Sequence, residues 1–255
     1  MLFNAMNIIT SFFSGCALAK VDIVIILDSS TSVGAGNYDK MLFNAMNIII
    51  SFFSGCALAK VDIVIILDSS TSVGSGNYDK MKNFCKDFLQ NADLDSGNVR
   101  VGILSYSSKV KIEFYLNSYG TFAEVADAID KIVYRYGSTN TADSLKSMRE
   151  EMFSTRNGDR DGVPDICIIL TDGVSNINSR KTIPQAVESR AAGIHIYAIG
   201  IGLRDTRELD GMASEPASEN SFNVKSFDEL SVLSEKIFEA FCPGKYRTTK
   251  FKITT

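Results

Sequence analysis

The sequence lacks several groups on which enzymes and nucleic-acid-binding proteins depend. It has no tryptophan and a single histidine, His195, which lies in an apolar stretch typical of a strand, so histidine-based catalysis has one weak candidate. It has no P-loop, no G-x-S-x-G motif and no C-x-x-C pair, which are common signatures of phosphate-binding loops, serine hydrolases and zinc sites. Its net charge of −4 argues against a nucleic-acid partner, which normally requires a basic surface.

Cysteine is also scarce. The five cysteines are too few and too scattered for a disulfide framework, and two of them, Cys85 and Cys167, fall at apolar positions that predict buried thiols. With 255 residues, of which 45% are hydrophobic, the chain can instead bury one substantial core and carry an appendage.

The front of the chain is a repeat. Residues 1–40 and 41–80 are near-copies that differ only at Thr10 against Ile50 and at Ala35 against Ser75. A recent duplication and a gene-model artefact that joins two first exons both account for it. The repeat does not continue beyond residue 80, which excludes a solenoid.

Each copy begins with an apolar segment and closes it with Ala-x-Ala, before Lys20 and again before Lys60. This pattern is typical of a secretory signal peptide, although the segment has no basic residue at its start. We therefore expect residues 1–59 to be a duplicated signal-peptide-like segment plus an orphan copy of the first strand of the domain and of the loop after that strand. The expected location is extracellular, and no membrane association is expected.

From residue 60 onward, strand-like and helix-like segments alternate. This alternation predicts an α/β fold with a doubly wound, mostly parallel sheet and helices on both faces. The expected domain covers residues 60–243, followed by a basic, disordered tail at 244–255. The expected strands are 61–67, 99–106, 110–115, 164–170, 194–201 and 222–224, and the expected helices are 81–90, 122–133, 140–153, 183–192, 205–213 and 227–241.

Oxygen-bearing side chains follow two of the buried strands. Asp68, Ser70 and Ser72 come after the first strand, and Asp172 comes after the strand at 164–170. Thr139 lies in a hydroxyl-rich loop ahead of a helix. Ligands bind at the carboxyl ends of strands in such sheets, and hard oxygen atoms suit a small divalent cation. The sequence therefore predicts a metal site at one edge of the sheet.

This pattern resembles the von Willebrand factor A domain family, which includes integrin inserted domains and the A domains of matrilins and collagen VI. In that family D-x-S-x-S, a later threonine and the aspartate of T-D-G form a metal-ion-dependent adhesion site. The matching residues here are Asp68, Ser70, Ser72, Thr139 and Asp172. The resemblance covers residues 61–242 and implies that family's Rossmann-like fold and a bound Mg²⁺, with Mn²⁺ or Ca²⁺ as alternatives.

The resemblance also implies a function. A secreted, non-enzymatic module would bind a protein ligand of the extracellular matrix or cell surface, whose Asp or Glu carboxylate completes the coordination of the cation. One alternative is an intracellular A-domain that scaffolds a larger assembly. The other is a metal-assisted hydrolase, which the absence of a D-x-D motif at Asp68 disfavours.

Two further features remain open or minor. Residues 157–162 resemble the start of a calcium loop, but Ile168 stands where a glutamate ligand is required, so we predict a polar turn. Members of the family often pair a terminal cysteine with one near the domain start. Here that implies Cys242 with Cys56, yet cleavage after Ala59 would remove Cys56, so the pairing state of Cys242 stays undecided.

Overall fold

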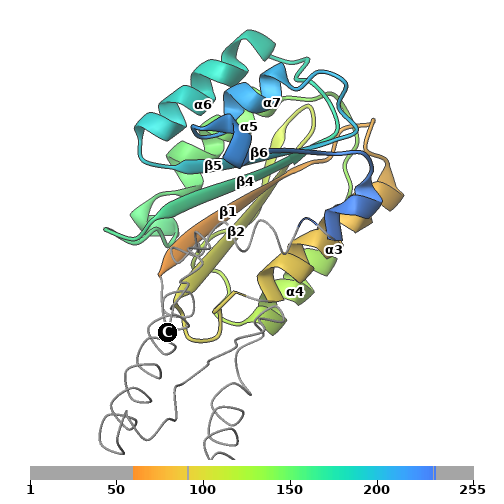
Figure 1. Cartoon of the computed structure of the whole chain (residues 1–255). Helices are drawn as coiled ribbons and strands as arrows, with labels where there is room; N and C mark the ends of the chain where they lie inside the picture. The colour runs from red at the N-terminus through yellow and green to blue at the C-terminus, as the bar shows by residue number, and fades with distance from the viewer. Residues whose placement is uncertain (1–59, 91, 232, 234–255) are drawn as a thin grey trace, which may run out of the picture. The chain divides into compact units, whose positions relative to one another are not determined.

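β1 (Val61–Asp68) lies inside a six-stranded sheet of order β3-β2-β1-β4-β5-β6 in the computed structural model, which describes residues 60–90, 92–231 and 233 (Figure 1). The antiparallel pair is β2 with β3, and every other neighbouring pair is parallel. The remaining strands are β2 (Val99–Tyr106), β3 (Val110–Phe114), β4 (Asp165–Thr171), β5 (His195–Ile201) and β6 (Ser221–Val224).

Helices cover both faces of this sheet. Figure 1 shows α3 (Ser75–Gln90) and α4 (Phe122–Asp130) on one face and α5 (Thr141–Ser147), α6 (Thr182–Ala191) and α7 (Arg207–Met212) on the other. The short helix α8 (Ala217–Asn220) precedes β6, and single turns occur at η2 (Thr155–Asn157), η3 (Ser179–Lys181) and η4 (Phe227–Glu229). The prediction of a doubly wound, mostly parallel α/β fold is therefore confirmed.

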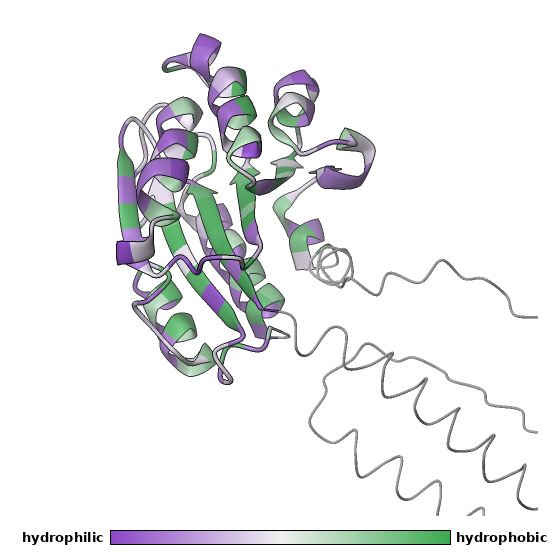
Figure 2. Cartoon of the chain, turned by 90° about the vertical axis from the view of Figure 1, so that its left-hand side faces the viewer, coloured by the Kyte–Doolittle hydropathy of each residue, from purple (hydrophilic) through white to green (hydrophobic). Residues whose placement is uncertain are grey.

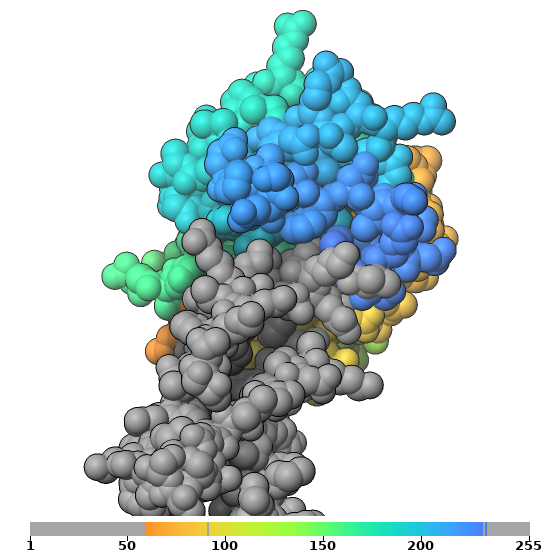
Figure 3. Space-filling view, viewed as in Figure 1, coloured from red at the N-terminus to blue at the C-terminus, as the bar shows by residue number. Residues whose placement is uncertain are grey.

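The core forms around β1 because its apolar residues face helices on both sides. Residues 63–67 are at most 3% exposed. Figure 2 shows the hydrophobic strands enclosed between helices whose outer faces are hydrophilic. A strand buried on both faces needs no polar alternation, which explains its uninterrupted run of Ile, Val and Leu. Figure 3 shows the chain from the same direction as Figure 1. The residues after β4, coloured from blue-green to blue, form most of the described surface visible in that view.

The second sequence copy supplies β1, as expected, and the first copy lies outside the described residues. So do the signal-like segments, the closing helix beyond residue 233, Cys56, Cys242 and the basic tail. Among the residues that the structure describes, no helix combines the length and the apolar character needed to cross a membrane.

Three expected helices were wrong in their extent by more than two residues. The helix expected at 81–90 already begins at Ser75, as α3. The helix expected to reach residue 133 ends as α4 at Asp130. The segment that follows forms hydrogen bonds with the loop after β1 instead of continuing the helix. The hydroxyl of Tyr134 donates to Ser70 O, and Arg135 N donates to Ser69 Oγ. The helix expected at 140–153 is α5 followed by a π-helical turn, η1 (Met148–Met152), which buries Met148 and Met152 against the sheet.

The single histidine and the two described cysteines take the structural roles expected of them. His195 begins β5, and its Nε2 lies 2.8 Å from Asn220 Oδ1. Cys85 and Cys167 are buried and free, and burial raises the pKa of Cys85 to about 12, so neither thiol is a reactive group at neutral pH.

Candidate metal centre

The predicted metal-binding residues lie where the sheet changes its direction of winding. From β1 the chain runs through α3 to β2 on one side, whereas from β4 it runs through α6 to β5 on the other side. Because α3 and α6 lie on opposite faces, the loops that follow β1 and β4 diverge between two adjacent strands (Figure 1). Such a switch point is where open α/β sheets leave room for a ligand.

Asp68 is the buried base of this site. It is the last residue of β1 and is 0% exposed. Its Oδ1 accepts a hydrogen bond from Ser70 N at 2.8 Å, and its Oδ2 accepts one from Thr171 Oγ1 at 2.7 Å and one from the Tyr106 hydroxyl at 3.3 Å. Burial raises the pKa of Asp68, and the nearby charge of Asp172 raises this pKa further, while the hydrogen bonds lower it.

Asp172 and Ser72 form the accessible side of the site, and Ser70 connects them to its buried base. Ser72 Oγ donates to Asp172 Oδ1 at 2.7 Å, and Ser70 Oγ lies 3.1 Å from Ser72 Oγ. Ser70 is buried and Ser72 is exposed, so this row of oxygen atoms runs from the core to the surface. Burial also raises the pKa of Asp172, against the opposing effect of the hydrogen bond from Ser72.

Thr139 lies in a loop that is bonded to both other loops. Its backbone N donates to Asn176 Oδ1 at 2.9 Å, and its carbonyl accepts from Asn176 N at 3.0 Å. Two residues earlier, Gly137 O accepts from Thr71 N at 2.9 Å, and Gly137 N donates to Thr71 Oγ1 at 3.0 Å. Within the described chain no hydrogen bond joins the Thr139 hydroxyl itself to the other four predicted residues, so its role as a ligand stays a prediction.

The structure therefore links four of the five predicted residues directly. Asp68 is bonded to Ser70, Ser70 contacts Ser72, and Ser72 is bonded to Asp172. Sequence reasoning missed the supporting groups Thr171 and Tyr106, because their bonds to Asp68 join strands that are far apart in the sequence. Only the position of Thr171 directly before Asp172 hinted at its role.

The donor set suits a hard divalent cation. It consists of carboxylate and hydroxyl oxygen atoms, the ligand types that Mg²⁺, Mn²⁺ and Ca²⁺ prefer, without a thiol or imidazole. Asp172 raises the pKa of Asp68 through charge repulsion, and a cation between the loops would relieve that repulsion. Because hydroxyl ligands are neutral, a cation held here would keep positive charge for a further anionic ligand.

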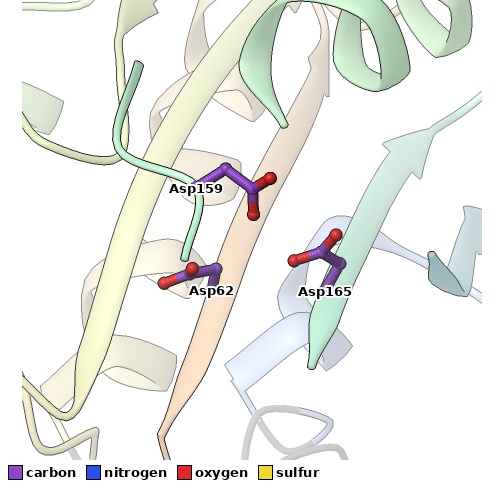
Figure 4. Close-up of side chains that lie close together, drawn as sticks. All are labelled: Asp62, Asp159 and Asp165. Carbon is purple, nitrogen blue, oxygen red and sulfur yellow. The ribbon is translucent and has the colours of Figure 1, made fainter. Parts of the chain in front are cut away.

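A second carboxylate cluster is distinct from this centre. Figure 4 shows Asp62, Asp159 and Asp165, which offer oxygen atoms within 4.8 Å of one another. Asp62 and Asp165 pair in register near the starts of β1 and β4, at the opposite end of the strands from Asp68. Arg160 bonds the buried Asp62 through its backbone N and its Nε, both at 2.9 Å, and so balances its charge.

The segment that resembles a calcium loop contributes Asp159 to this cluster but does not form such a loop. Asn157, its first expected ligand, donates through Nδ2 to the carbonyl of Glu151. Burial raises the pKa of Asp165 to about 7, and the charge of Asp159 adds to this rise. The segment is thus the expected polar turn, and it also brings Arg160 into its ion pair with Asp62 of β1.

Comparisons with known proteins agree with this architecture. A family profile described as von Willebrand factor type A domain matches residues 62–236, and a second profile of the same description matches residues 21–55. The mouse collagen alpha-4(VI) chain is 32% identical over 91% of this chain and 8% of its own length. Chicken matrilin-3 is 33% identical over 64% of this chain and 36% of its own length.

A solved structure matches the fold as well. Proximal thread matrix protein 1 from the mussel byssus, in a structure with a zinc-occupied MIDAS motif, is 29% identical, has a TM-score of 0.68, and is matched over 72% of this chain and 48% of its own. The chain therefore spans less than half the length of each of these proteins.

Proposed function

The chain belongs to the von Willebrand factor type A domain family, and we propose that it is a divalent-cation-dependent module that binds a protein of the extracellular matrix. The observation that carries the proposal is the row of oxygen atoms formed by Asp68, Ser70, Ser72 and Asp172 at the switch point. The proposed ligands of the cation are these four residues together with Thr139. Mg²⁺ is the proposed ion, with Mn²⁺ or Ca²⁺ as alternatives.

The proposed mechanism uses the difference in burial between the two carboxylates. Asp68 is held rigidly in the core by three hydrogen bonds, whereas Ser72 and Asp172 reach the surface. The cation, when bound, supplies a positive centre at which an Asp or Glu of the partner completes the coordination. The protein's own part is to fix the oxygen atoms in advance, so that little ordering remains at the moment of binding.

Exposed apolar groups beside the site support a protein partner. Tyr136 is 70% exposed and Val174 is 53% exposed, and they lie in the loops that also contain Thr139 and Asp172. Exposed aromatic side chains on rigid loops are typical of residues that contribute much of the binding energy in protein interfaces.

The names of the similar proteins support the matrix context. One is a collagen chain, another is a matrilin and a third is a thread matrix protein. We place the domain at residues 60–243, with residues 1–59 as a signal-like appendage and 244–255 as a tail, and propose that the protein acts outside the cell. We propose no catalytic activity, because the histidine begins β5 at the end of the sheet opposite the metal loops.

The test is binding of the full chain to immobilised matrix proteins, such as collagens, in Mg²⁺ and in EDTA. The expected result is binding in Mg²⁺ that is lost in EDTA and in Asp68→Ala. The matched control is Asp127→Ala, which removes an exposed aspartate from α4 and should bind like the wild type. Binding that persists unchanged in EDTA would contradict the proposed mechanism.

A further inference from the structure

The end of β2 lies between two of the loops that carry the proposed metal ligands, although none of its residues was predicted as a ligand. The carbonyl of Tyr106, the last residue of β2, accepts a hydrogen bond from Ser69 N at 2.7 Å. The next carbonyl, that of Ser107, accepts one from Asn140 N at 3.0 Å. The backbone here therefore sets the spacing between the loop after β1 and the loop before α5.

The side chain of Tyr106 makes a second connection between the same two loops. It is 1% exposed, and its hydroxyl lies 3.3 Å from Thr141 Oγ1, which donates to it, and 3.3 Å from Asp68 Oδ2, to which it donates. Thr141 is the first residue of α5, two positions after Thr139. A buried hydrogen-bond chain thus runs from the start of α5 through Tyr106 to Asp68.

We propose that Tyr106 is a positioning residue of the metal centre: its hydroxyl, ordered by Thr141, orients the Asp68 carboxylate and so raises the affinity for a divalent cation. The inference rests on the proposed function, because it concerns the same cation site. Groups that hydrogen-bond to a metal-binding carboxylate fix its orientation, and their loss typically weakens metal affinity by about 10–100-fold.

Tyr106 acts through Asp68 and not on the cation itself. Its hydroxyl proton is directed at Asp68 Oδ2, and its oxygen accepts from Thr141, so both sides of the hydroxyl are engaged. Asp68 Oδ2 also accepts from Thr171 Oγ1 at 2.7 Å, so removal of the longer Tyr106 bond leaves one anchor in place. The expected loss therefore lies at the low end of that range.

The test compares Tyr106→Phe with Tyr78→Phe in the full chain. Both changes delete one hydroxyl from a tyrosine that is 1% exposed, but the Tyr78 hydroxyl has no hydrogen-bond partner in the described structure. Isothermal titration with Mg²⁺ and with Mn²⁺ is expected to show a dissociation constant about tenfold higher for Tyr106→Phe. Tyr78→Phe is expected to bind both ions like the wild type.

A double-mutant cycle of Tyr106→Phe and Thr141→Val separates a positioning role of Tyr106 from a general effect on the structure. If the chain of hydrogen bonds runs through Tyr106, Thr141→Val weakens cation affinity in the wild type by about two- to threefold but has no further effect in Tyr106→Phe. A purely structural role would instead lower the unfolding temperature in EDTA and leave the dissociation constant unchanged.

Each outcome bears on one level of the proposal. Wild-type affinity in a folded Tyr106→Phe overturns the role of Tyr106 while the metal site stands. If the wild type binds neither Mg²⁺ nor Mn²⁺, both the role of Tyr106 and the proposed metal site are overturned. If Tyr106→Phe does not fold, unchanged affinity in Thr141→Val overturns the inference.

Discussion

Ser72 Oγ donates a 2.7 Å hydrogen bond to Oδ1 of Asp172, a residue 100 positions further along the chain. This bond joins the loop after β1 to the loop after β4, and it does so at the surface. Both side chains are proposed cation ligands. A bound cation would therefore contact the two loops at the same place where this hydrogen bond joins them.

Asp172→Asn should weaken cation binding without harming the fold. Burial raises the pKa of Asp172, so its charge costs free energy in the folded state, and an amide of the same shape removes that cost. We expect Mg²⁺ and Mn²⁺ affinity to fall at least about tenfold, by titration calorimetry. The unfolding temperature in EDTA should equal or exceed that of the wild type.

The control for that experiment is Asp127→Asn, which alters an exposed aspartate of α4 and should keep wild-type cation affinity. Undiminished affinity in Asp172→Asn would remove this residue from the proposed ligand set.

Arg160→Ala should destabilise the domain more than any exposed ion pair would. It removes the guanidinium paired with the Asp62 carboxylate, which is 0% exposed, and leaves that charge only the hydrogen bond from the backbone N of residue 160. Breaking a buried pair on one side typically costs about 3–5 kcal/mol, and chemical denaturation would measure it. The control is Arg207→Ala, whose pair with Asp205 lies in solvent and should contribute nothing measurable.

The double variant Arg160→Met/Asp62→Leu gives a further check. It removes both charges, so it should be more stable than Arg160→Ala. If the double variant were less stable than the single one, the loss in Arg160→Ala could not be attributed to an unpaired Asp62.

Stability should fall as pH rises toward neutrality because of Asp165. Its folded pKa is raised to about 7 from an ordinary 3.8, so between these values the folded state binds more protons than the unfolded state. The free energy of unfolding therefore decreases as pH rises through this window and levels off above it. The carboxylates that face Asp165 are Asp159 and Asp62, and Arg160 pairs with Asp62.

The measurement is urea unfolding at several pH values between 5 and 8. Asp165→Asn should flatten the dependence and be the more stable variant at pH 8, whereas Asp127→Asn should keep the wild-type slope. An equal slope in wild type and Asp165→Asn would show that another group titrates.

Tyr136 should lower the free energy of unfolding of the domain but strengthen binding of the proposed protein partner. Its φ of 41° lies in the left-handed region, which costs a side chain about 1–2 kcal/mol relative to glycine. The loop holds it there, because Arg135 N donates to Ser69 Oγ and Gly137 N donates to Thr71 Oγ1.

Tyr136→Gly should therefore raise the free energy of unfolding by about 0.5–1 kcal/mol, after allowance for the greater freedom of glycine in the unfolded chain. Tyr136→Ala removes the ring but keeps the strain, so it should not be stabilised. Both variants should bind the protein partner more weakly. Wild-type binding by both would place the ring outside the interface.

Local patterns predicted the sheet and the edge at which Asp68 and Asp172 lie. The run of apolar residues ending at Asp68 marks a strand buried on both faces, and a similar run stops just before Asp172. Because parallel strands end at the same edge of a sheet, the two aspartates were expected at one edge, and β1 and β4 are indeed parallel neighbours. The second copy of the repeat was expected to supply the first strand, because in the sequence only that copy runs on into residues with helical spacing, and β1 is Val61–Asp68.

The features that sequence reasoning missed depend on distant partners. α4 ends early because Tyr134 and Arg135 bond the loop after β1, which no local periodicity reveals. The role of Tyr106 depends on a hydroxyl of α5, and the carboxylate cluster depends on Asp62 meeting a turn 98 positions later. In each case the local sequence allowed several conformations and tertiary contacts selected one.

The central position of β1 has a consequence for biosynthesis. β1 is the first described strand to leave the ribosome, but its neighbour β4 is made much later: Asp68 and its partner Thr171 are 103 positions apart. Until then one edge of an uninterrupted apolar strand has no neighbour, which is the kind of nascent segment that chaperones shield from aggregation. Translation that stalls between these two strands should therefore yield insoluble or chaperone-bound chains.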